Sequence, residues 1–550
     1  MLLALPIGVL AACTTSLFRL AIDLSGLLLF DSRDDITVVM AGLDWQWRVL
    51  VPSAGGLVAG LFLWWELRLP GTAVESDYMD AVSAGDGRIP FRSSILRSLS
   101  SLATIVSAGS IGREGAMVQL AALSGSLAGR RWANIETLRL CTACGAAAGL
   151  ASVYHTPFAG ALFVAEVVLG SITVDRLIPL FAATVAATLV TYMLVGEGAP
   201  LALTQAQFLW NSVDLLMLLP VGVLAGLAAP PFLSLLSVSK TGFSRIPLPL
   251  LARMVLGGLL MGLVAVLVPE VCGNGYAPIV AILHGEPMSA AIIWVLIAKV
   301  AATVIIVGSG AVGGIFTPSL FIGAALGAVL ANIAMHIPGM DNANGVLLAL
   351  AGMAAFMAAV SHAPLMAILM VFEMTLDASL LLPLMIVCVV SYTVSSIFRS
   401  HESLYHVLRR RELQQSQMRR FETLPLGELV KPADNCLSAD ASWLEARDMF
   451  QRVQTRYLYL LDADNNFVGA LSVHKLNEVL NRHPVKGESA VRELVDTEFL
   501  ALAPEMKLAE AWKIFNRLPL GRIPVVTTEK QFLGVVSKSD LQDRAMYLSI

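Results

Sequence analysis

Residues 109–119 read Gly-Ser-Ile-Gly-Arg-Glu-Gly-Ala-Met-Val-Gln, and this stretch decides the fold. It lies between two strongly apolar segments, residues 98–108 and 116–128. An ionic pair is costly in hydrocarbon, so Arg113 and Glu114 are not expected to face lipid. The three glycines loosen the backbone where a helix should begin. The combination predicts a broken membrane helix whose N-terminus opens into a polar cavity, with Glu114 in an anion path.

The composition is that of a polytopic helical membrane protein. The chain has 550 residues, of which 56% are apolar and only 14% charged, and its mean hydropathy is +0.73. Soluble proteins carry about 25% charged residues. The net charge of −4 is uninformative, because the charges are unevenly placed along the chain. No nucleic-acid partner is expected. The six cysteines show no disulfide framework. The apolar run from Leu2 to Leu29 is too long for a signal peptide and fits a first membrane helix.

An internal repeat divides the apolar part of the chain. The block from Gly145 to Glu166 matches the block from Gly352 to Glu373, with Gly, His, Pro and Glu at equivalent positions. Several apolar segments are shorter than the roughly 20 residues that a spanning helix needs, and those that begin at Gly or Pro predict helices that end at mid-membrane depth. The sequence therefore predicts two related halves with a site between them. An inverted relation is a hypothesis, because the repeat alone does not fix orientation.

A second broken-helix start precedes the second copy of the repeat. Residues 313–318 read Gly-Gly-Ile-Phe-Thr-Pro and lead into a run rich in glycine and alanine. The free N–H groups at a helix start, with the positive end of the helix dipole, bind anions without a full positive charge. Such attraction suits a conduit, because the ion must also be released. The alternative is a packing face of small residues, which is common in membrane helices.

The composition changes at about residue 399. Arginines cluster after the last apolar segment, which predicts that this end is cytoplasmic. Residues 423–550 are soluble in character and contain another repeat, in which Phe467-Val-Gly-Ala-Leu-Ser472 matches Phe532-Leu-Gly-Val-Val-Ser537. Each unit predicts strand, helix, strand, strand, helix, and Asp464-Asn-Asn466 predicts a hairpin turn.

Four features together resemble the CLC chloride channel/transporter family, and the wording is closest to its bacterial ClcB-type branch: the Gly-Arg-Glu-Gly at 112–115, the Gly-Gly-Ile-Phe-Thr-Pro at 313–318, the block from Gly145 to Glu166, and Tyr405. The resemblance implies an all-α polytopic membrane fold of two inverted repeats of broken helices. It also implies a homodimer in the lipid bilayer of the cell (inner) membrane, with one anion path per subunit and no required cofactor. The C-terminal repeat resembles a tandem pair of CBS domains, which have an α/β fold.

The expected domains follow from these two resemblances. Residues 1–412 form the anion-permeation domain and residues 413–422 a basic linker. Residues 423–485 and 486–550 form the first and second CBS domains, on the cytoplasmic side.

The family resemblance also implies roles for individual residues. Glu114 matches the gating glutamate, whose side chain competes with the anion for its site. The backbone amides of Ile315 and Phe316 and the hydroxyl of Tyr405 match the central anion ligands. The neighbours of Glu114 are assigned to the same anion-binding set, namely Arg113 and Gly115.

Two positions depart from the family pattern. Ala73 stands where the family often has a serine that touches the central anion, and alanine has no hydroxyl to offer. Val167 follows Glu166 where proton-coupled members have a second glutamate that relays protons from inside. A valine cannot carry a proton, so a relay through this position is excluded. This favours a channel, although some coupled members lack the glutamate too.

Three further patterns could be read as functional sites, but a structural role or a wrong spacing explains each of them. Glu166 and Glu373 occur at equivalent places in the two copies, so we interpret them as structural carboxylates that cap backbone N–H groups, and His155 and His362 likewise as structural. His401-Glu-Ser-Leu-Tyr-His406 suggests a metalloprotease, but zinc binding on a helix needs histidines at i and i+4 rather than i and i+5. No catalytic residue and no metal ligand are assigned.

The CBS pair predicts at most one nucleotide site. Ser537 and Asp540 match the hydroxyl and acidic residues expected for the phosphate and ribose of an adenine nucleotide such as ATP, ADP or AMP. The first unit has Lys475 at the acidic position, after Ser472. A purely structural or dimerising module is an equal alternative.

The sequence therefore predicts voltage- or pH-gated, channel-like permeation of chloride or similar small anions, with Glu114 as the gate. The alternative is a chloride/proton antiporter that lacks the usual inner proton glutamate. The remote alternative is an intramembrane metalloprotease.

Overall fold

The computed structural model describes residues 3–547 except 33, 70–76, 84, 132–133, 197–200, 202–209, 285–290, 341, 399–423, 483–488 and 519. Tyr405, Ala73, the predicted basic linker and the pair His401 and His406 lie outside the described residues. The chain divides into two compact units, Met1–Arg409 and Arg410–Ile550, each described by itself below.

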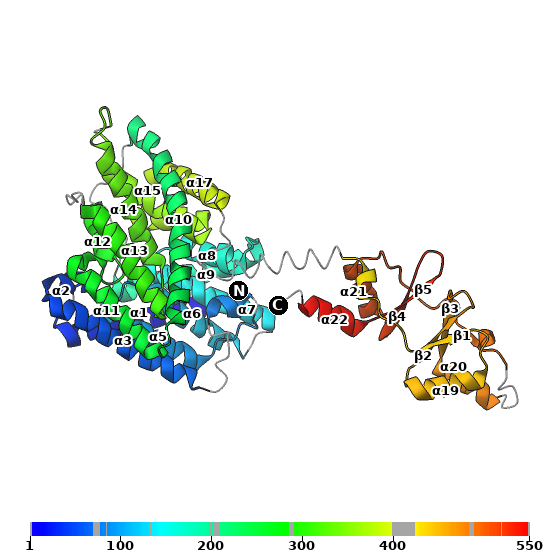
Figure 1. Ribbon diagram of the computed structural model, residues 1–550. Helices are drawn as coiled ribbons and strands as arrows, with labels where there is room; N and C mark the ends of the chain where they lie inside the picture. The colour runs from blue at the N-terminus through cyan, green and yellow to red at the C-terminus, as the bar shows by residue number, and fades with distance from the viewer. Residues whose placement is uncertain are drawn as a thin grey trace. The chain divides into compact units, whose positions relative to one another are not determined.

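The first unit is built from helices (Figure 1). In chain order its elements are α1 (Ala4–Phe30), α2 (Ile36–Gly42), α3 (Trp45–Leu67), α4 (Tyr78–Ser83), α5 (Phe91–Val106), α6 (Glu114–Gly129), α7 (Ile135–Tyr154), α8 (Pro157–Phe163), the π-helix η1 (Val164–Leu169), α9 (Val174–Val195), α10 (Ser212–Arg245), α11 (Leu250–Leu267), the 3₁₀ helix η2 (Pro269–Val271), α12 (Tyr276–Leu283), α13 (Ala291–Ser309), α14 (Phe316–Ala334), α15 (Gly345–Ser361), α16 (Pro364–Thr375), the 3₁₀ helix η3 (Ala378–Leu380) and α17 (Leu381–Ile397).

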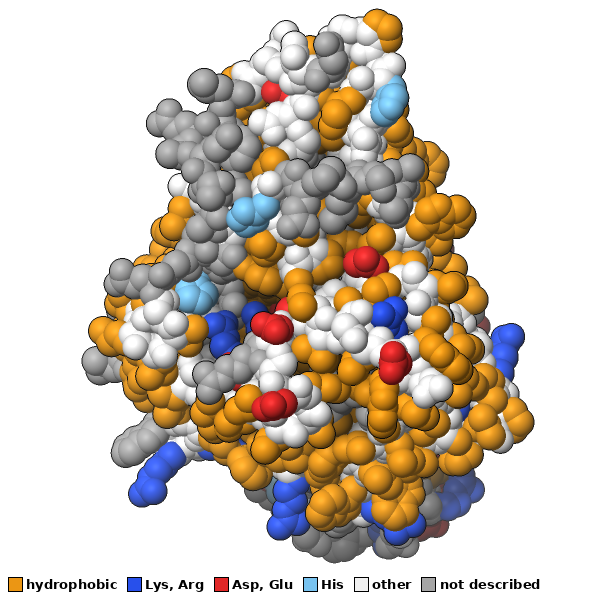
Figure 2. All heavy atoms as spheres, turned by 90° about the vertical axis from the view of Figure 1, so that its left-hand side faces the viewer, with side chains coloured by type: hydrophobic (Ala, Val, Ile, Leu, Met, Phe, Trp, Pro, Cys, Tyr) orange, Lys and Arg blue, Asp and Glu red, His pale blue; other side chains and the backbone are white. Residues whose placement is uncertain are grey.

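Eight of the helices in the described part of the chain are long and apolar enough to cross a membrane. Their outer faces stay apolar, with side chains such as Leu28 and Met193 each 83% exposed. Figure 2 shows apolar side chains over most of the face it presents, with charged side chains scattered singly among them. An apolar exterior of this extent is stable in lipid and not in water. Shorter apolar helices such as α8 and α16 confirm the prediction of helices too short to span.

The C-terminal unit repeats one α/β motif. Its elements are η4 (Leu426–Leu429), β1 (Cys436–Ser438), α19 (Trp443–Val453), β2 (Tyr457–Leu461), β3 (Phe467–Ser472), α20 (Val473–Arg482), η6 (Val491–Leu494), α21 (Leu508–Arg517), β4 (Arg522–Val526), β5 (Phe532–Ser537) and α22 (Lys538–Tyr547). Strands β1 and β2 pair in parallel, and β2–β3 and β4–β5 are antiparallel.

The predicted repeat of this unit is present in its backbone from the first helix of each half onward, whereas the described residues form only an isolated bridge, Leu502 with Val525, where the first strand of the second half was predicted. The β2–β3 hairpin shifts register between Leu460 and Leu461, and the β4–β5 hairpin shifts between Val525 and Val526, at the equivalent place. The predicted turn at 464–466 is confirmed, because Asn465 takes a left-handed φ of 63° and Asp462 accepts the N–H groups of the residues around it.

The repeat of the membrane unit is equally visible in its helix boundaries. Helix α7 ends at a left-handed His155 (φ 58°) and α8 begins at Pro157. Helix α15 ends at a left-handed His362 (φ 55°) and α16 begins at Pro364. A residue in the left-handed region ends a helix, and proline fits the first helical position. The same local chemistry therefore breaks the chain at the same place in both halves.

Two carboxylates fasten the halves to each other. Glu373, near the end of α16, accepts the N–H groups of Phe158 and Ala159 at 2.9 and 2.8 Å. Glu166 accepts the N–H groups of Leu365 and Met366 at 3.4 and 2.9 Å. Each copy thus caps the short helix of the other copy, satisfying N–H groups that a helix start leaves free. The interpretation of both residues as caps is confirmed by these contacts.

Replacing Glu373 by alanine leaves two backbone donors of α8 without their acceptor. Hydrogen bonds to charged groups contribute about 1.5–3 kcal/mol each, so we expect a clear fall in the thermal unfolding temperature of the detergent-solubilised protein. Glu136→Ala, at an exposed site at the start of α7, is the matched control and should unfold at the wild-type temperature. Equal unfolding temperatures for Glu373→Ala and wild type would contradict the capping role.

Candidate functional site

The two predicted broken-helix starts meet at a pair of glycines. The N–H of Gly112 donates to the carbonyl of Gly314 at 2.6 Å, and the N–H of Gly314 donates to the carbonyl of Gly112 at 2.9 Å. The pairing is antiparallel, which is the relation expected of two segments around a two-fold axis. Helix α6 begins two residues after Gly112 and α14 two residues after Gly314. The positive ends of two helix dipoles, one from each half, therefore converge here.

Glu114 places its carboxyl group at this junction. The side chain is buried, with 3% of its surface exposed. The hydroxyl of Tyr154 donates to Glu114 Oε1 at 2.5 Å and lies 2.7 Å from the hydroxyl of Thr317. Among the described residues, Glu114 Oε2 has no hydrogen-bond partner. A Cβ at either glycine of the pair would overlap this carboxyl group, so only glycine leaves room for it.

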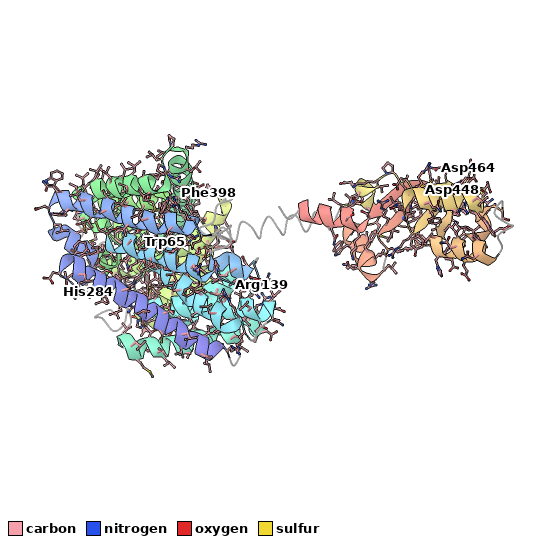
Figure 3. The ribbon with its side chains drawn as sticks, turned by 90° about the horizontal axis from the view of Figure 1, so that it is seen from below. Trp65, Arg139, His284, Phe398, Asp448 and Asp464 are labelled. Atoms are coloured by element: carbon pink, nitrogen blue, oxygen red, sulfur yellow. The ribbon has the colours of Figure 1, made fainter. Side chains whose placement is uncertain are left out.

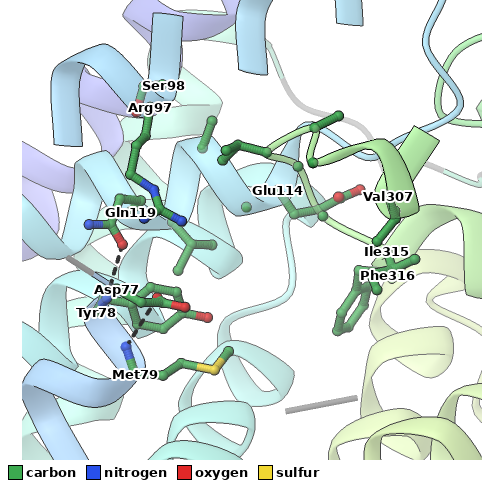
Figure 4. A pocket seen from close by; sticks show the side chains of 18 of the residues that line it. Asp77, Tyr78, Met79, Arg97, Ser98, Glu114, Gln119, Val307, Ile315 and Phe316 are labelled. Atoms are coloured by element: carbon green, nitrogen blue, oxygen red, sulfur yellow. Dashed lines mark hydrogen bonds between the residues drawn. The ribbon is translucent and has the colours of Figure 1, made fainter. Parts of the chain in front are cut away.

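A cavity of about 620 Å³ begins at this carboxyl group. Glu114, Gly115, Ile315 and Phe316 line it at one end, as Figure 4 shows for three of them. Charged side chains from four other elements or their ends also line it, namely Asp77, Asp80, Arg97, Lys240 and Arg253.

A smaller cavity of about 160 Å³ adjoins the other side of the same contacts. Tyr154 and Thr317, which form the hydrogen-bond chain to Glu114, line this cavity together with Arg19, Arg113 and His155. The buried carboxyl group therefore stands between a larger and a smaller polar cavity. The smaller cavity has two arginines and no carboxylate in its described lining, which attracts anions, whereas the larger cavity has three basic side chains and three carboxylates.

The structure brings most of the predicted site residues together. Arg113 lines the smaller cavity, and Gly115, Ile315 and Phe316 line the larger one with Glu114. Val167 is 1% exposed within the π-helix η1. It is absent from the described lining of either cavity.

Sequence reasoning missed two residues of this site. Tyr154 in the first half of the repeat is equivalent to Ser361 in the second half. This difference between the two copies was the one sequence signal that could have identified Tyr154 as a site residue. Gln119 is a lone amide within the apolar helix α6. Its Oε1 accepts the N–H of Tyr78 at 3.0 Å, and its Nε2 donates to Ser94 Oγ at 3.0 Å. This side chain therefore joins α4 and α5 to the helix that Glu114 begins.

The predicted nucleotide residues of the C-terminal unit also lie together. The hydroxyl of Ser537 donates to Asp540 Oδ2 at 2.6 Å, and the Lys431 ammonium lies 2.5 Å from Asp540 Oδ1. Partial burial raises the pKa of the Asp540 carboxyl, but the hydrogen bonds from Lys431 and Ser537 outweigh it, so the pKa lies below its usual value. One oxygen of this carboxylate is therefore engaged by a lysine of the same unit.

The chain matches the family model "Voltage gated chloride channel" over residues 54–396. The chain belongs to this family, the CLC family. Its members are transport proteins rather than enzymes. A ClcB-like chloride channel protein of Ralstonia nicotianae is 44% identical over 397 residues, covering 71% of this chain and 92% of that protein. That match leaves no room in the relative for a counterpart of the C-terminal unit.

Two solved structures are similar to the membrane unit. One is described as a slow cyanobacterial Cl⁻/H⁺ antiporter, with 25% identity and a TM-score of 0.65, covering 75% of this chain and 97% of that one. The other is described as a CLC-type fluoride/proton antiporter, with 25% identity and a TM-score of 0.60, covering 74% of this chain and 96% of that one. Residues 491–546 match the CBS domain model, so the C-terminal unit contains a CBS domain.

Replacing Tyr154 by phenylalanine tests how firmly Glu114 is held. The carboxylate loses a hydrogen bond that contributes about 1.5–3 kcal/mol, so a chloride ion competing for the same place should bind about tenfold more tightly. Isothermal titration of the purified protein with chloride measures this. Tyr192→Phe, whose ring lies 5.2 Å from that of His155, is the control. Weaker chloride binding to Tyr154→Phe would contradict the expectation and identify the hydroxyl as an anion ligand.

Proposed function

We propose that the protein exchanges chloride, or a similar small anion, for protons across the membrane, with Glu114 as the gate that also carries the proton. The observation that carries this proposal is the buried Glu114 carboxyl group between two polar cavities, at the point where helix starts from both halves converge. Similarity at 25% identity to two proton-coupled anion antiporters supports the exchanger over the channel.

The chemistry of the exchange follows from competition for one place. An ionised Glu114 presents a negative charge to the N-termini of α6 and α14, where a chloride ion would otherwise be attracted. Protonation removes that charge, so the neutral side chain leaves the place to the anion. Backbone N–H groups at Ile315 and Phe316, at the start of α14, are suited to hold the anion weakly enough for release. The Glu114 carboxyl group therefore either carries a proton or, when ionised, excludes the anion. This competition couples proton movement to anion movement.

The channel remains the second candidate function. The name of the Ralstonia relative favours it, and Val167 removes the usual inner proton carrier. A channel and an exchanger differ in one measurable property. Only the exchanger moves protons against their own gradient when chloride flows down its gradient.

A reconstituted flux measurement with simultaneous pH recording separates the two functions. In liposomes with a chloride gradient, wild-type protein should drive protons uphill. Glu114→Ala and Glu114→Gln should still pass chloride but lose proton movement and most of the pH dependence of the chloride flux, because neither side chain titrates. Glu136→Ala is the control outside both cavities and should behave as wild type. Chloride flux without uphill proton movement in the wild type would establish the channel.

The cytoplasmic location of the C-terminal unit is part of this proposal. The loop 85–90 lies beside the end of α6 and the start of α7, since the side chains of Arg130 and Arg139 donate to the carbonyls of Ile89 and Gly85. Arg88, Arg92 and Arg131 add to the positive charge of this region. Figure 3 shows Arg139 and Phe398, at the end of the last described helix of this unit, toward one side and His284 toward the other. An excess of arginine at the side where the chain leaves the membrane supports a cytoplasmic C-terminal unit. The homodimer and the inner membrane stay predictions.

For the C-terminal unit we propose at most one adenine nucleotide site, at Ser537 and Asp540. Asp540 is ionised at neutral pH and lies beside the Ser537 hydroxyl, which suits ribose and phosphate oxygens. When ribose hydroxyls bind to Asp540, Lys431 must either keep its contact with one carboxylate oxygen or give it up. In the first unit, Lys475 stands in the acidic position and offers no acceptor.

Isothermal titration of the full chain with ATP, ADP and AMP tests this site. We expect one nucleotide per chain and loss of binding in Asp540→Ala, with Lys475→Ala unchanged as the matched control. No heat with any of the three nucleotides would leave the pair as a structural module.

A further inference from the structure

The larger cavity is lined by Asp77, a carboxylate that has no role in the exchange mechanism proposed above. The side chain of Asp77 is exposed to that space. Its side chain accepts the N–H of Met79, at 3.3 Å to Oδ1, and also interacts with the backbone N–H of Tyr78. Glu166 and Glu373 are both occupied as caps of membrane helices, whereas Asp80 shares the cavity wall with Asp77. Asp77 caps only the first turn of the six-residue helix α4, and its side chain faces the cavity, where it can bind and release a proton.

The fold ties Asp77 to the same helix as Glu114. The next residue, Tyr78, donates its N–H to Gln119, which lies on α6 five residues after Glu114. Five helical residues rise about 7.5 Å along the axis. Figure 4 shows Asp77 and Tyr78 beneath Gln119, at a different level of the cavity from Glu114. A proton that passes between the two carboxyl groups therefore needs a chain of water molecules through the cavity.

The cavity reaches the arginine-rich side of the unit from Asp77. Arg97 lies in the second turn of α5, the helix that follows the loop 85–90. Lys240 belongs to the last two turns of α10, and Arg253 to the first turn of α11. These three residues line the same cavity. By the same charge bias used above, this end is the cytoplasmic one, so Asp77 lies on the inner side of Glu114.

The groups facing Asp77 are mixed in sign. Asp80 lies on α4, which begins directly after Asp77, and Arg97 faces Asp77 from α5. Arg97 is also 4.0 Å from the carboxylate of Glu66 on α3. Lys240 and Arg253 contribute positive charge from α10 and α11, and Gln119 is the neutral polar group from α6. The basic side chains attract chloride into the cavity, while Asp77 offers the proton-binding group beside that path.

We propose that Asp77 is the inner proton relay of this exchanger, in the role for which Val167 is unsuited. The proposal rests on the proposed exchange function. In the step, the protonated Asp77 carboxyl releases its proton to a cavity water, and the proton passes along the water chain to the Glu114 carboxylate. Asp77 is left ionised and takes its next proton from the cytoplasmic solution. One O–H bond breaks and one forms, so charge and proton number are conserved.

The test is the ratio of protons to chloride ions moved by the full chain in liposomes. Asp77→Asn and Asp77→Ser should lower that ratio by about 100-fold, the scale of a lost acid–base group, while chloride still flows. Asp77→Glu should restore coupling, because it returns a titratable carboxyl group. Asp80→Asn, on the same helix and cavity wall, should keep the wild-type ratio. Asp86→Asn, at an exposed ion pair with Arg88, is the control outside the cavity.

Each result decides the proposal. Coupled transport in wild type and in Asp77→Asn overturns the Asp77 relay and leaves the exchanger standing. An Asp80→Asn protein that uncouples while Asp77→Asn does not would move the role to Asp80. An Asp77→Glu protein that passes chloride without protons overturns the relay even if the asparagine and serine variants do not fold. Wild type without uphill proton movement overturns both the exchanger and its relay.

Discussion

The structure depends on one constraint, which is that helices beginning inside an apolar region must find partners for their first N–H groups. The chain meets it in two ways. At α8 and α16 the partners are Glu373 and Glu166, each supplied by the opposite half. At α6 and α14, Gly112 and Gly314 pair through their backbones and join the two helix starts. Among the described contacts, no carboxylate of another helix caps these two starts. The first pair of helix starts is capped by carboxylates of the opposite half, and the Glu114 carboxyl group lies at the second pair.

Much of this arrangement was readable from local sequence signals. Glycine, proline and a buried charge pair interrupt apolar runs visibly, so the helix starts at Glu114, Phe316 and Pro364 were predictable to within a residue or two. The strands were predictable for the same reason: the β-rich run Tyr457–Asp462 exceeds the strand β2 by one residue. Such features are decided by neighbours in the chain, where propensity and periodicity act.

Contacts between distant residues were not readable in this way. Tyr154 reaches Glu114 across 40 residues, and Gln119 reaches Tyr78 across 41. Each contact depends on how the helices pack. In the sequence, Tyr154 looks like an ordinary core tyrosine and Gln119 like an ordinary buried amide. Comparison of the two halves did not identify Tyr154, because that comparison selects positions that are identical in both copies and the equivalent residue is Ser361. The departures between the halves therefore carry the functional asymmetry, while the identities carry the architecture.

Glu166 shows why a carboxylate next to the expected proton position cannot take over that role here. Both of its oxygens accept backbone N–H groups at the start of α16. Protonating it would convert one acceptor into a donor facing another donor, which leaves a helix start unsatisfied in an apolar setting. Its neighbour Val167 is enclosed and cannot titrate. In the proposed exchange, the inner proton route therefore runs through the larger cavity rather than through η1, and the residues of the cavity wall determine which group can pass the proton on.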